Sequence, residues 1–199
     1  MKLSGVVVTC ALPSASYVEE TTRVAGIRVD YSQSMALGDV VTLTGTLTTV
    51  DGERALSVHL AEVLVGAAGD LPPIAMNSAT LGGGPSGYQQ AVTEYRMVRT
   101  AQGTLRQALP AGGANNVGLL VRITGKVTGI GDGCFYIDDG SGCDDGSGLI
   151  GVRVIRGSMA KPVVGTRMMV TGVSSTCFER GALWRAVVLP TEAYASVMQ

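Results

Sequence analysis

Apolar and polar positions alternate in short runs along most of the chain, and glycine-bearing turns separate the runs. In the second half these runs cover roughly 119–130, 133–138, 149–156, 166–174 and 182–189. Alternation over a few residues is typical of a β-strand with one face in the core. The runs therefore predict a small all-β unit.

The same succession of runs occurs twice in the chain. The matching segments are LSGVVVT (3–9) with ITGKVTG (123–129), GIRV (26–29) with GVRV (151–154), and GDVVTLTG (38–45) with GTRMMVTG (165–172). An internal repeat defines the architecture before single strands are assigned. We expect a first copy within 1–66, a linker at 67–117, a second copy within 118–190 and a tail at 191–199.

The first strand of each copy is long and carries a glycine, Gly5 or Gly125, at which it can bend. Five short strands with such a bend suit a closed barrel, which leaves no exposed edge. In these features each copy resembles the OB-fold, the oligonucleotide/oligosaccharide-binding barrel. The resemblance implies an all-β protein of two five-stranded Greek-key barrels, joined by a long, partly ordered linker.

A narrower resemblance covers MNSATLGGGPSGYQQ (76–90) and NNVGLLVRITGKVTGIGDGCFYIDDGSG (115–142). These stretches are similar to modules of large, uncharacterised secreted or surface bacterial proteins that carry tandem OB-like domains. The resemblance implies an extracellular or cell-surface location, with the targeting segment outside this chain. It implies no established activity.

The segment 67–117 has no partner in the repeat and is long for a simple connection. In it, Ala91, Val92, Tyr95, Met97 and Val98 have spacings that predict one short helix. Its apolar side chains are costly to leave in water, so we expect the segment to pack on the barrels. A disordered tether is the alternative.

Composition and charge narrow the classes of function. The net charge of −1 gives no basic footprint for nucleic acid. No apolar run reaches the roughly 18 residues of a membrane helix, so no membrane insertion is expected. The chain has one histidine, no CxxC pair, no GxSxG and no phosphate-binding loop with its lysine. We therefore expect no enzymatic activity and no cofactor.

The second and third strands of each copy carry a tyrosine and an arginine on the outer face of the barrel: Tyr17, Arg28, Tyr136 and Arg153. OB-folds usually bind their ligands there, which makes these residues candidates for stacking on single-stranded nucleic acid or oligosaccharide. The alternative is that each arginine pairs with the acid across from it, Glu19 or Asp138, and stabilises the sheet.

A second aromatic and basic cluster lies near the last strand and contains Phe178, Arg180, Trp184 and Arg185. Trp184 and Arg180 are further ligand candidates, although a lone tryptophan more often belongs to a core or an interface. Matching ERAL (53–56) with RGAL (180–183) puts Ser57 at the position of Trp184. The role of Trp184 is then not repeated in the first copy.

The segment FYIDDGSGCDDGSG (135–148) contains two pairs of acids in a glycine and serine context. One flexible loop does not hold two carboxyl groups across a substrate, which argues against catalysis. Asp139, Asp144 and Asp145 are candidate calcium ligands, although their spacing does not match an EF-hand. A hydrophilic turn is the alternative, because Asp and Gly are turn residues.

The four cysteines are Cys10, Cys134, Cys143 and Cys177. An even number is compatible with disulfides in an oxidising compartment. Four cysteines allow three pairings, and the sequence does not select one. Buried free thiols are the alternative.

Together these features favour a non-enzymatic extracellular or cell-surface module with a structural or interaction role. We expect its partners to be proteins, including copies of itself in a fibre or surface array. The alternative is a module that binds single-stranded nucleic acid or a glycan through the tyrosine and arginine faces.

Overall fold

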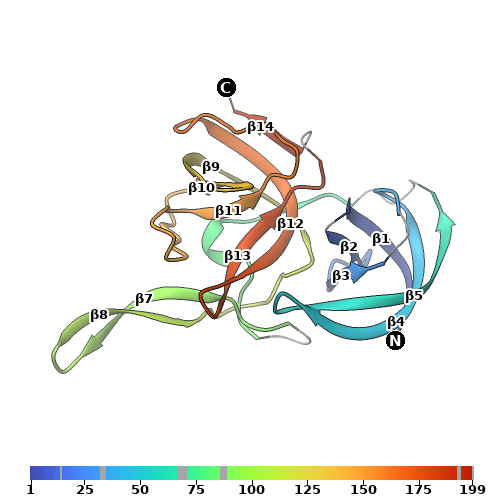
Figure 1. Cartoon of the computed structure of the whole chain (residues 1–199), viewed down its shortest axis with the longest axis horizontal. Helices are drawn as coiled ribbons and strands as arrows, with labels where there is room; N and C mark the ends of the chain where they lie inside the picture. Colours follow the sequence, from blue (N-terminus) through green and yellow to red (C-terminus); the bar gives the residue numbers. More distant parts are fainter. Residues whose placement is uncertain (14, 32–34, 67–70, 86–88, 192–193, 199) are drawn as a thin grey trace.

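A computed structural model of the chain describes all residues except 14, 32–34, 67–70, 86–88, 192–193 and 199. The described part is all-β apart from one 3-10 turn, η1 (Ser78–Thr80), which confirms the all-β part of the expected fold class. Figure 1 shows two bodies of strands side by side, with a two-stranded hairpin extending from their base. No helix among the described residues is long and apolar enough to cross a membrane.

The first copy is a closed barrel with the strand order β1-β2-β3-β5-β4. Its strands are β1 (Lys2–Leu12), β2 (Ala15–Glu19), β3 (Gly26–Asp30), β4 (Val40–Val50) and β5 (Glu53–Val65). All neighbours are antiparallel except β3 and β5, which pair in parallel. At Gly5 the β1–β4 register shifts and φ is +64°, so β1 bends there as expected.

The second copy lies in a seven-stranded sheet with the order β14-β12-β13-β11-β10-β9-β6. Its strands are β6 (Ile74–Ala75), β9 (Leu120–Ile130), β10 (Cys134–Asp138), β11 (Val152–Ile155), β12 (Arg167–Glu179), β13 (Ala182–Val188) and β14 (Ala195–Val197). An additional β12–β9 pairing joins the two ends of the run β9-β10-β11-β13-β12. The five repeated strands therefore pair in the same order in both copies, including the parallel pair β11–β13.

The tail at the C-terminus belongs to the second sheet. In the first copy Val41 of β4 pairs with Val63, in the second half of the long strand β5. At the matching position of the second copy, Met168 of β12 pairs with Val197 of β14. The chain leaves the sheet after β13 and returns to it as β14. In the second copy β14 therefore occupies the position beside β12 that the end of β5 occupies beside β4 in the first copy.

The match between the two fifth strands needs correction. Ala55 in β5 and Ala186 in β13 each pair with the arginine of the third strand in their copy. Two residues earlier in each strand are Glu53 and Trp184. The counterpart of Trp184 is therefore Glu53 and not Ser57, because the β12–β13 hairpin is longer than the β4–β5 hairpin.

The helix expected in the linker is absent: Tyr95, Met97 and Val98 lie in β7 (Thr93–Thr100), which forms a hairpin with β8 (Gly103–Pro110), and Ala91 and Val92 precede it. Tyr95 and Met97 lie on one face of β7 and Val98 on the other, as alternation in a strand requires. Hydrogen bonding between β7 and β8 therefore determines the structure of this segment, although the spacing of its apolar residues also suits a helix. The linker packs on the second copy, because Leu81 is 0% exposed and belongs to the second core.

A buried apolar cluster joins the two copies. It contains Cys10 and Tyr17 from the first copy and Leu120, Val173 and Val188 from the second. Beside this cluster the two backbones meet at Gly26 and Gly118. A Cβ atom on Gly26 would lie 2.2 Å from the carbonyl oxygen of Gly118. Only glycine permits so close an approach, and the two copies therefore pack as one body.

We predict that Gly26→Ala destabilises the protein by about 1–3 kcal/mol, because the added methyl group forces the two backbones apart. Gly112→Ala is the control, since the nearest atom to its Cβ would be Nη2 of Arg96 at 3.7 Å. We expect that variant to stay within about 0.5 kcal/mol of the wild type. Urea unfolding measures both, and equal losses would contradict the role of Gly26.

Candidate functional site

The tyrosine and arginine face of the first barrel lies against the second copy. Tyr17 is 0% exposed, and its hydroxyl group lies 2.8 Å from Oγ of Ser175 in β12. The same hydroxyl donates to Oε2 of Glu53 at 3.0 Å, and Ser175 donates to that oxygen at 3.0 Å. Arg28 lies 3.7 Å from Asp51. The face is an interface within the chain.

Glu53 is the buried acid of this interface. Desolvation raises the pKa of its carboxyl group to about 7, although hydrogen bonds from Ser175 and Tyr17 and the charge of Arg28 oppose the shift. A carboxyl group that titrates near neutral pH couples the packing of the two copies to pH.

A second polar contact between the copies is centred on Glu19. Its Oε2 accepts a hydrogen bond from the backbone N–H of Leu120 at 2.7 Å, and its Oε1 pairs with Arg23. Arg23 in turn donates to the carbonyl oxygen of Leu120 at 2.8 Å. Burial raises the pKa of Glu19 against these stabilising contacts. Arg23 therefore links a strand of one copy to the first strand of the other.

The matching face of the second copy is covered by the loop that follows β10. Tyr136 is 2% exposed and donates to Oδ2 of Asp145 at 2.8 Å. Arg153 donates to the same oxygen at 2.8 Å and to the hydroxyl of Tyr136 at 3.0 Å, and it also pairs with Glu179. These four side chains thus hydrogen-bond and ion-pair with one another. They lie at the position that faces the second copy in the first barrel.

Asp145 remains charged in this cluster. Burial alone would raise its pKa, but hydrogen bonds from Ser147 and Tyr136 and the charge of Arg153 outweigh burial, so the pKa is lowered. Glu179 also has a lowered pKa, chiefly because of its hydrogen bond from Arg153. The carboxylates of Asp145 and Glu179 and the guanidinium group of Arg153 thus form a charged network that joins the loop to the strands.

The expected pairing of each arginine with the acid across from it is wrong. Arg28 lies opposite Tyr17 in the register, and Arg153 lies opposite Tyr136. Glu19 faces Gly26. Both arginines instead reach acids outside strands two and three, which the strand pattern does not indicate.

The acidic loop is a set of turns. In each case an aspartate side chain accepts a hydrogen bond from the backbone N–H two residues ahead: Asp139 from Ser141 at 3.0 Å, Asp144 from Gly146 at 2.7 Å, and Asp145 from Ser147 at 2.9 Å. This is the local bonding that favours aspartate in turns. The remaining oxygens face the N–H of Ser78, Arg106 and Arg153.

The geometry does not favour calcium at these acids. Within the described residues, no group of three or more His, Cys, Asp or Glu side chains is arranged to hold a metal. Hydrogen bonds and ion pairs already occupy oxygens of Asp139, Asp144 and Asp145. The turn interpretation therefore explains the acids more completely.

Trp184 anchors the β7–β8 hairpin. It is 3% exposed, its ring stacks on Tyr95 with centroids 5.3 Å apart, and the guanidinium group of Arg106 lies 3.7 Å from the centre of the Tyr95 ring. Arg185 adds a 2.9 Å ion pair with Glu94. Trp184 is thus an interface residue. The nearby candidate Arg180 donates to the backbone oxygen of Asp145 at 3.3 Å.

All four cysteines are free thiols, so the expected disulfides are absent. Cys10 lies in the cluster between the copies, where desolvation raises its pKa to about 12. The Sγ atoms of Cys143 and Cys177 accept hydrogen bonds from Arg185 at 3.4 Å and Arg153 at 3.1 Å. Cys134 is buried in β10. Each thiol therefore has its own packing environment.

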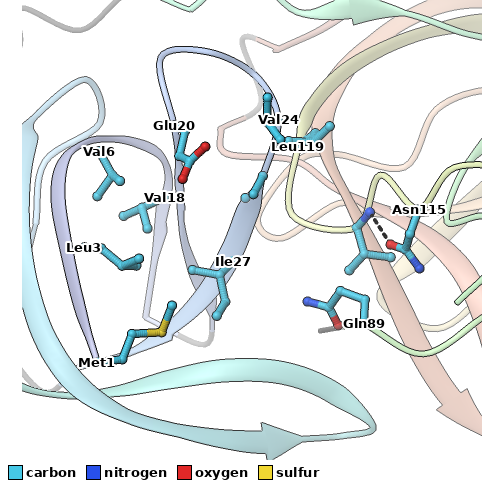
Figure 2. A pocket seen from close by; sticks show the side chains of 13 residues that line it. Met1, Leu3, Val6, Val18, Glu20, Val24, Ile27, Gln89, Asn115 and Leu119 are labelled. Carbon is cyan, nitrogen blue, oxygen red and sulfur yellow. Dashed lines mark hydrogen bonds between the residues drawn. The ribbon is translucent and has the colours of Figure 1, made fainter. Parts of the chain in front are cut away.

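A cavity of about 330 Å³ lies between the first barrel and the segment that leads into β9. Figure 2 shows Leu3, Val18 and Ile27 on the barrel side and Asn115 on the opposite side. Among the described residues that line the cavity, Glu20 alone has an ionisable side chain. The amino group of Met1 donates to the carbonyl oxygen of Gly45 at 2.7 Å. The repeat pattern gave no indication of this cavity, because it lies where the two copies meet.

The chain has no match among protein-family models, curated proteins or solved structures. Its function must therefore be inferred from its own geometry.

Sequence reasoning found the tyrosines and arginines but missed Glu53, Ser175 and the covering role of Asp145. The signal for Glu53 was present, since an acid stands at the position that tryptophan has in the other copy. Recognising it required the correct register of the fifth strands. Ser175 carries no sequence signal, because its role comes from packing between distant segments.

We predict that Glu53→Gln removes a pH dependence of stability. The folded-state pKa of about 7 exceeds the ordinary value of 4.5, so the stability from this group is full below pH 4.5 and is lost as pH rises through 7. The amide cannot ionise, so the variant should match the wild type at pH 4.5 and exceed it at pH 8 by up to about 3 kcal/mol. Urea unfolding at both pH values measures the difference.

Glu62→Gln is the matched control, since Glu62 is exposed in the same strand. Its pH profile should follow the wild type. A Glu53→Gln profile that also follows the wild type would contradict the assigned role.

We predict that Asp145→Asn destabilises the protein by about 1–3 kcal/mol, because buried Arg153 loses one of its two carboxylate partners. Asp144→Asn should cost about 0–1 kcal/mol, because its partner Arg106 is half-exposed. Thermal unfolding followed by circular dichroism compares the two neighbours. A larger loss for Asp144→Asn would refute the assignment.

Proposed function

We propose that this protein is a non-enzymatic structural or interaction module made of two OB-like barrels. Support for the two-barrel interpretation comes from the identical pairing order of the repeated strands and from the β12–β9 pairing that joins the ends of the second run. The extracellular or cell-surface location stays a prediction from the sequence resemblance.

One observation carries the proposal: both faces that an OB-fold would use for a ligand are covered by the chain itself. The first face is held by Tyr17, Glu53 and Ser175, and the second by Tyr136, Asp145 and Arg153. Stacking of a base or sugar needs an open aromatic ring. Here both rings have become part of the packing.

The same contacts support a rigid module. Covering the faces fixes the first copy to the second and fixes the acidic loop to its barrel. Buried hydrogen-bonded networks of this kind give a single well-defined arrangement of parts. We infer that the arginines and acids serve this rigidity, and that ligand binding through these two faces is the less supported alternative.

A binding panel tests the proposal. Fluorescence anisotropy with single-stranded DNA and RNA 20-mers, together with a glycan array, should show no binding tighter than about 10⁻⁴ M, the weak end for non-specific contacts. Calorimetry should show one cooperative unfolding transition for both copies.

The contrary result is salt-dependent binding that is lost in Arg28→Ala with Arg153→Ala and retained in the exposed control Arg167→Ala. Circular dichroism spectra establish that the variants are folded. That result would favour the ligand-binding alternative.

A further inference from the structure

The β7–β8 hairpin is a rigid arm. Its strands pair without a register shift from Thr93 opposite Pro110 to Thr100 opposite Gly103. At its base Tyr95 stacks on Trp184 and Glu94 pairs with Arg185. An isolated two-stranded hairpin is marginally stable in water. The contacts at the base therefore hold the arm in one direction, away from the barrels (Figure 1).

The outer part of the arm combines apolar and basic side chains that lack partners. Met97 is 67% and Leu105 is 48% exposed. Arg99, near the tip, forms no ion pair with any residue that the structure describes. The arm carries three arginines and one glutamate, a net charge of +2, and the remaining chain then has −3.

The cavity beside the first barrel has the complementary properties. Its walls are mainly apolar, and Leu3, Val18 and Ile27 come from the barrel. Its volume of about 330 Å³ is in the range of sites that hold a small group. Glu20 accepts a hydrogen bond from Thr22 at 3.2 Å and has no salt bridge within the described chain. The described lining of the cavity is thus mainly apolar and includes one acidic side chain, Glu20, without a salt bridge.

We propose that the arm of one molecule docks in this cavity of a second copy, with Met97 in the apolar hollow and Arg99 against Glu20. This inference rests on the proposed function as an interaction module and assigns the partner. The arm extends away from strands β1 to β3, which border the cavity, so a chain does not fill its own site (Figure 1).

Arm and cavity are different surfaces of the chain, so the contact is heterologous. Heterologous contacts form either closed rings or open filaments, depending on the rotation between subunits. Charge complementarity favours a second copy, since the basic arm meets an acidic body. Each molecule offers one arm and one such cavity, so assembly closes as a reciprocal dimer or a larger ring, or continues as a filament, according to that rotation.

Sedimentation of the full chain over a range of concentrations tests the proposal. The wild type should form dimers or larger species as concentration rises. Glu20→Arg and Met97→Asp should each raise the dissociation constant by more than about tenfold, because one puts like charges together and the other puts a charge in an apolar site. The controls Glu62→Arg and Val163→Asp change exposed residues elsewhere and should assemble as the wild type.

Two combinations of variants give sharper results. Glu20→Arg combined with Arg99→Glu in one chain reverses the pair and should restore assembly. Met97→Asp, which keeps its cavity, mixed with Glu20→Arg, which keeps its arm, should give a one-to-one complex that does not grow further. Only a heterologous contact predicts this capped pair.

A wild type that stays monomeric at high concentration overturns the inference, and so does failure of the two complementary variants to combine. The inference is also overturned if the control variants dissociate as much as Glu20→Arg and Met97→Asp do. It is overturned as well if the protein does not self-associate but binds an oligonucleotide in a way that depends on Arg99. If the ligand panel shows no binding and the protein stays monomeric, this inference is wrong but the proposed function still stands. Binding lost with Arg28 and Arg153 would instead remove the proposed function.

Discussion

The packing of the first barrel onto the second copy is the contact on which the rest of the structure depends. It places Tyr17, Glu53 and Ser175 in one buried cluster and brings Gly26 and Gly118 into backbone contact. Once this face is closed, the copies cannot act as independent barrels. The cavity lies beside this contact, while the arm is held by Trp184 and Arg185 of the second copy.

The two copies show how one strand pattern can serve different contacts. Each has a tyrosine opposite an arginine in strands two and three. In the first copy the tyrosine meets the second copy, while in the second a loop brings Asp145 over the same position. In both cases a buried tyrosine hydroxyl needs a hydrogen-bond partner, and an acid from outside the two strands supplies it.

Residues that first look like ligand or metal sites thus have structural explanations. The acids of the 139–145 loop close turns and pair with arginines. Trp184 stacks on Tyr95 and so holds the base of the arm. The arm tip and the cavity near Glu20 are among the exposed surfaces of the described residues, and the proposed contact uses these two.

Much of the strand content, the repeat and the bend at Gly5 followed from sequence alone, because alternation and glycine act locally. The outward direction of Tyr17 and Arg28 was equally predictable from strand period. The hairpin at 93–110 was not, since its apolar spacing also suits a helix and pairing between two strands decided the outcome. Nor were the roles of Glu53, Ser175 and β14, whose partners lie far away in the chain. Local patterns determined which segments of the two repeated copies are strands. Long-range packing decided what covers them, because burial depends on segments that sequence order keeps apart.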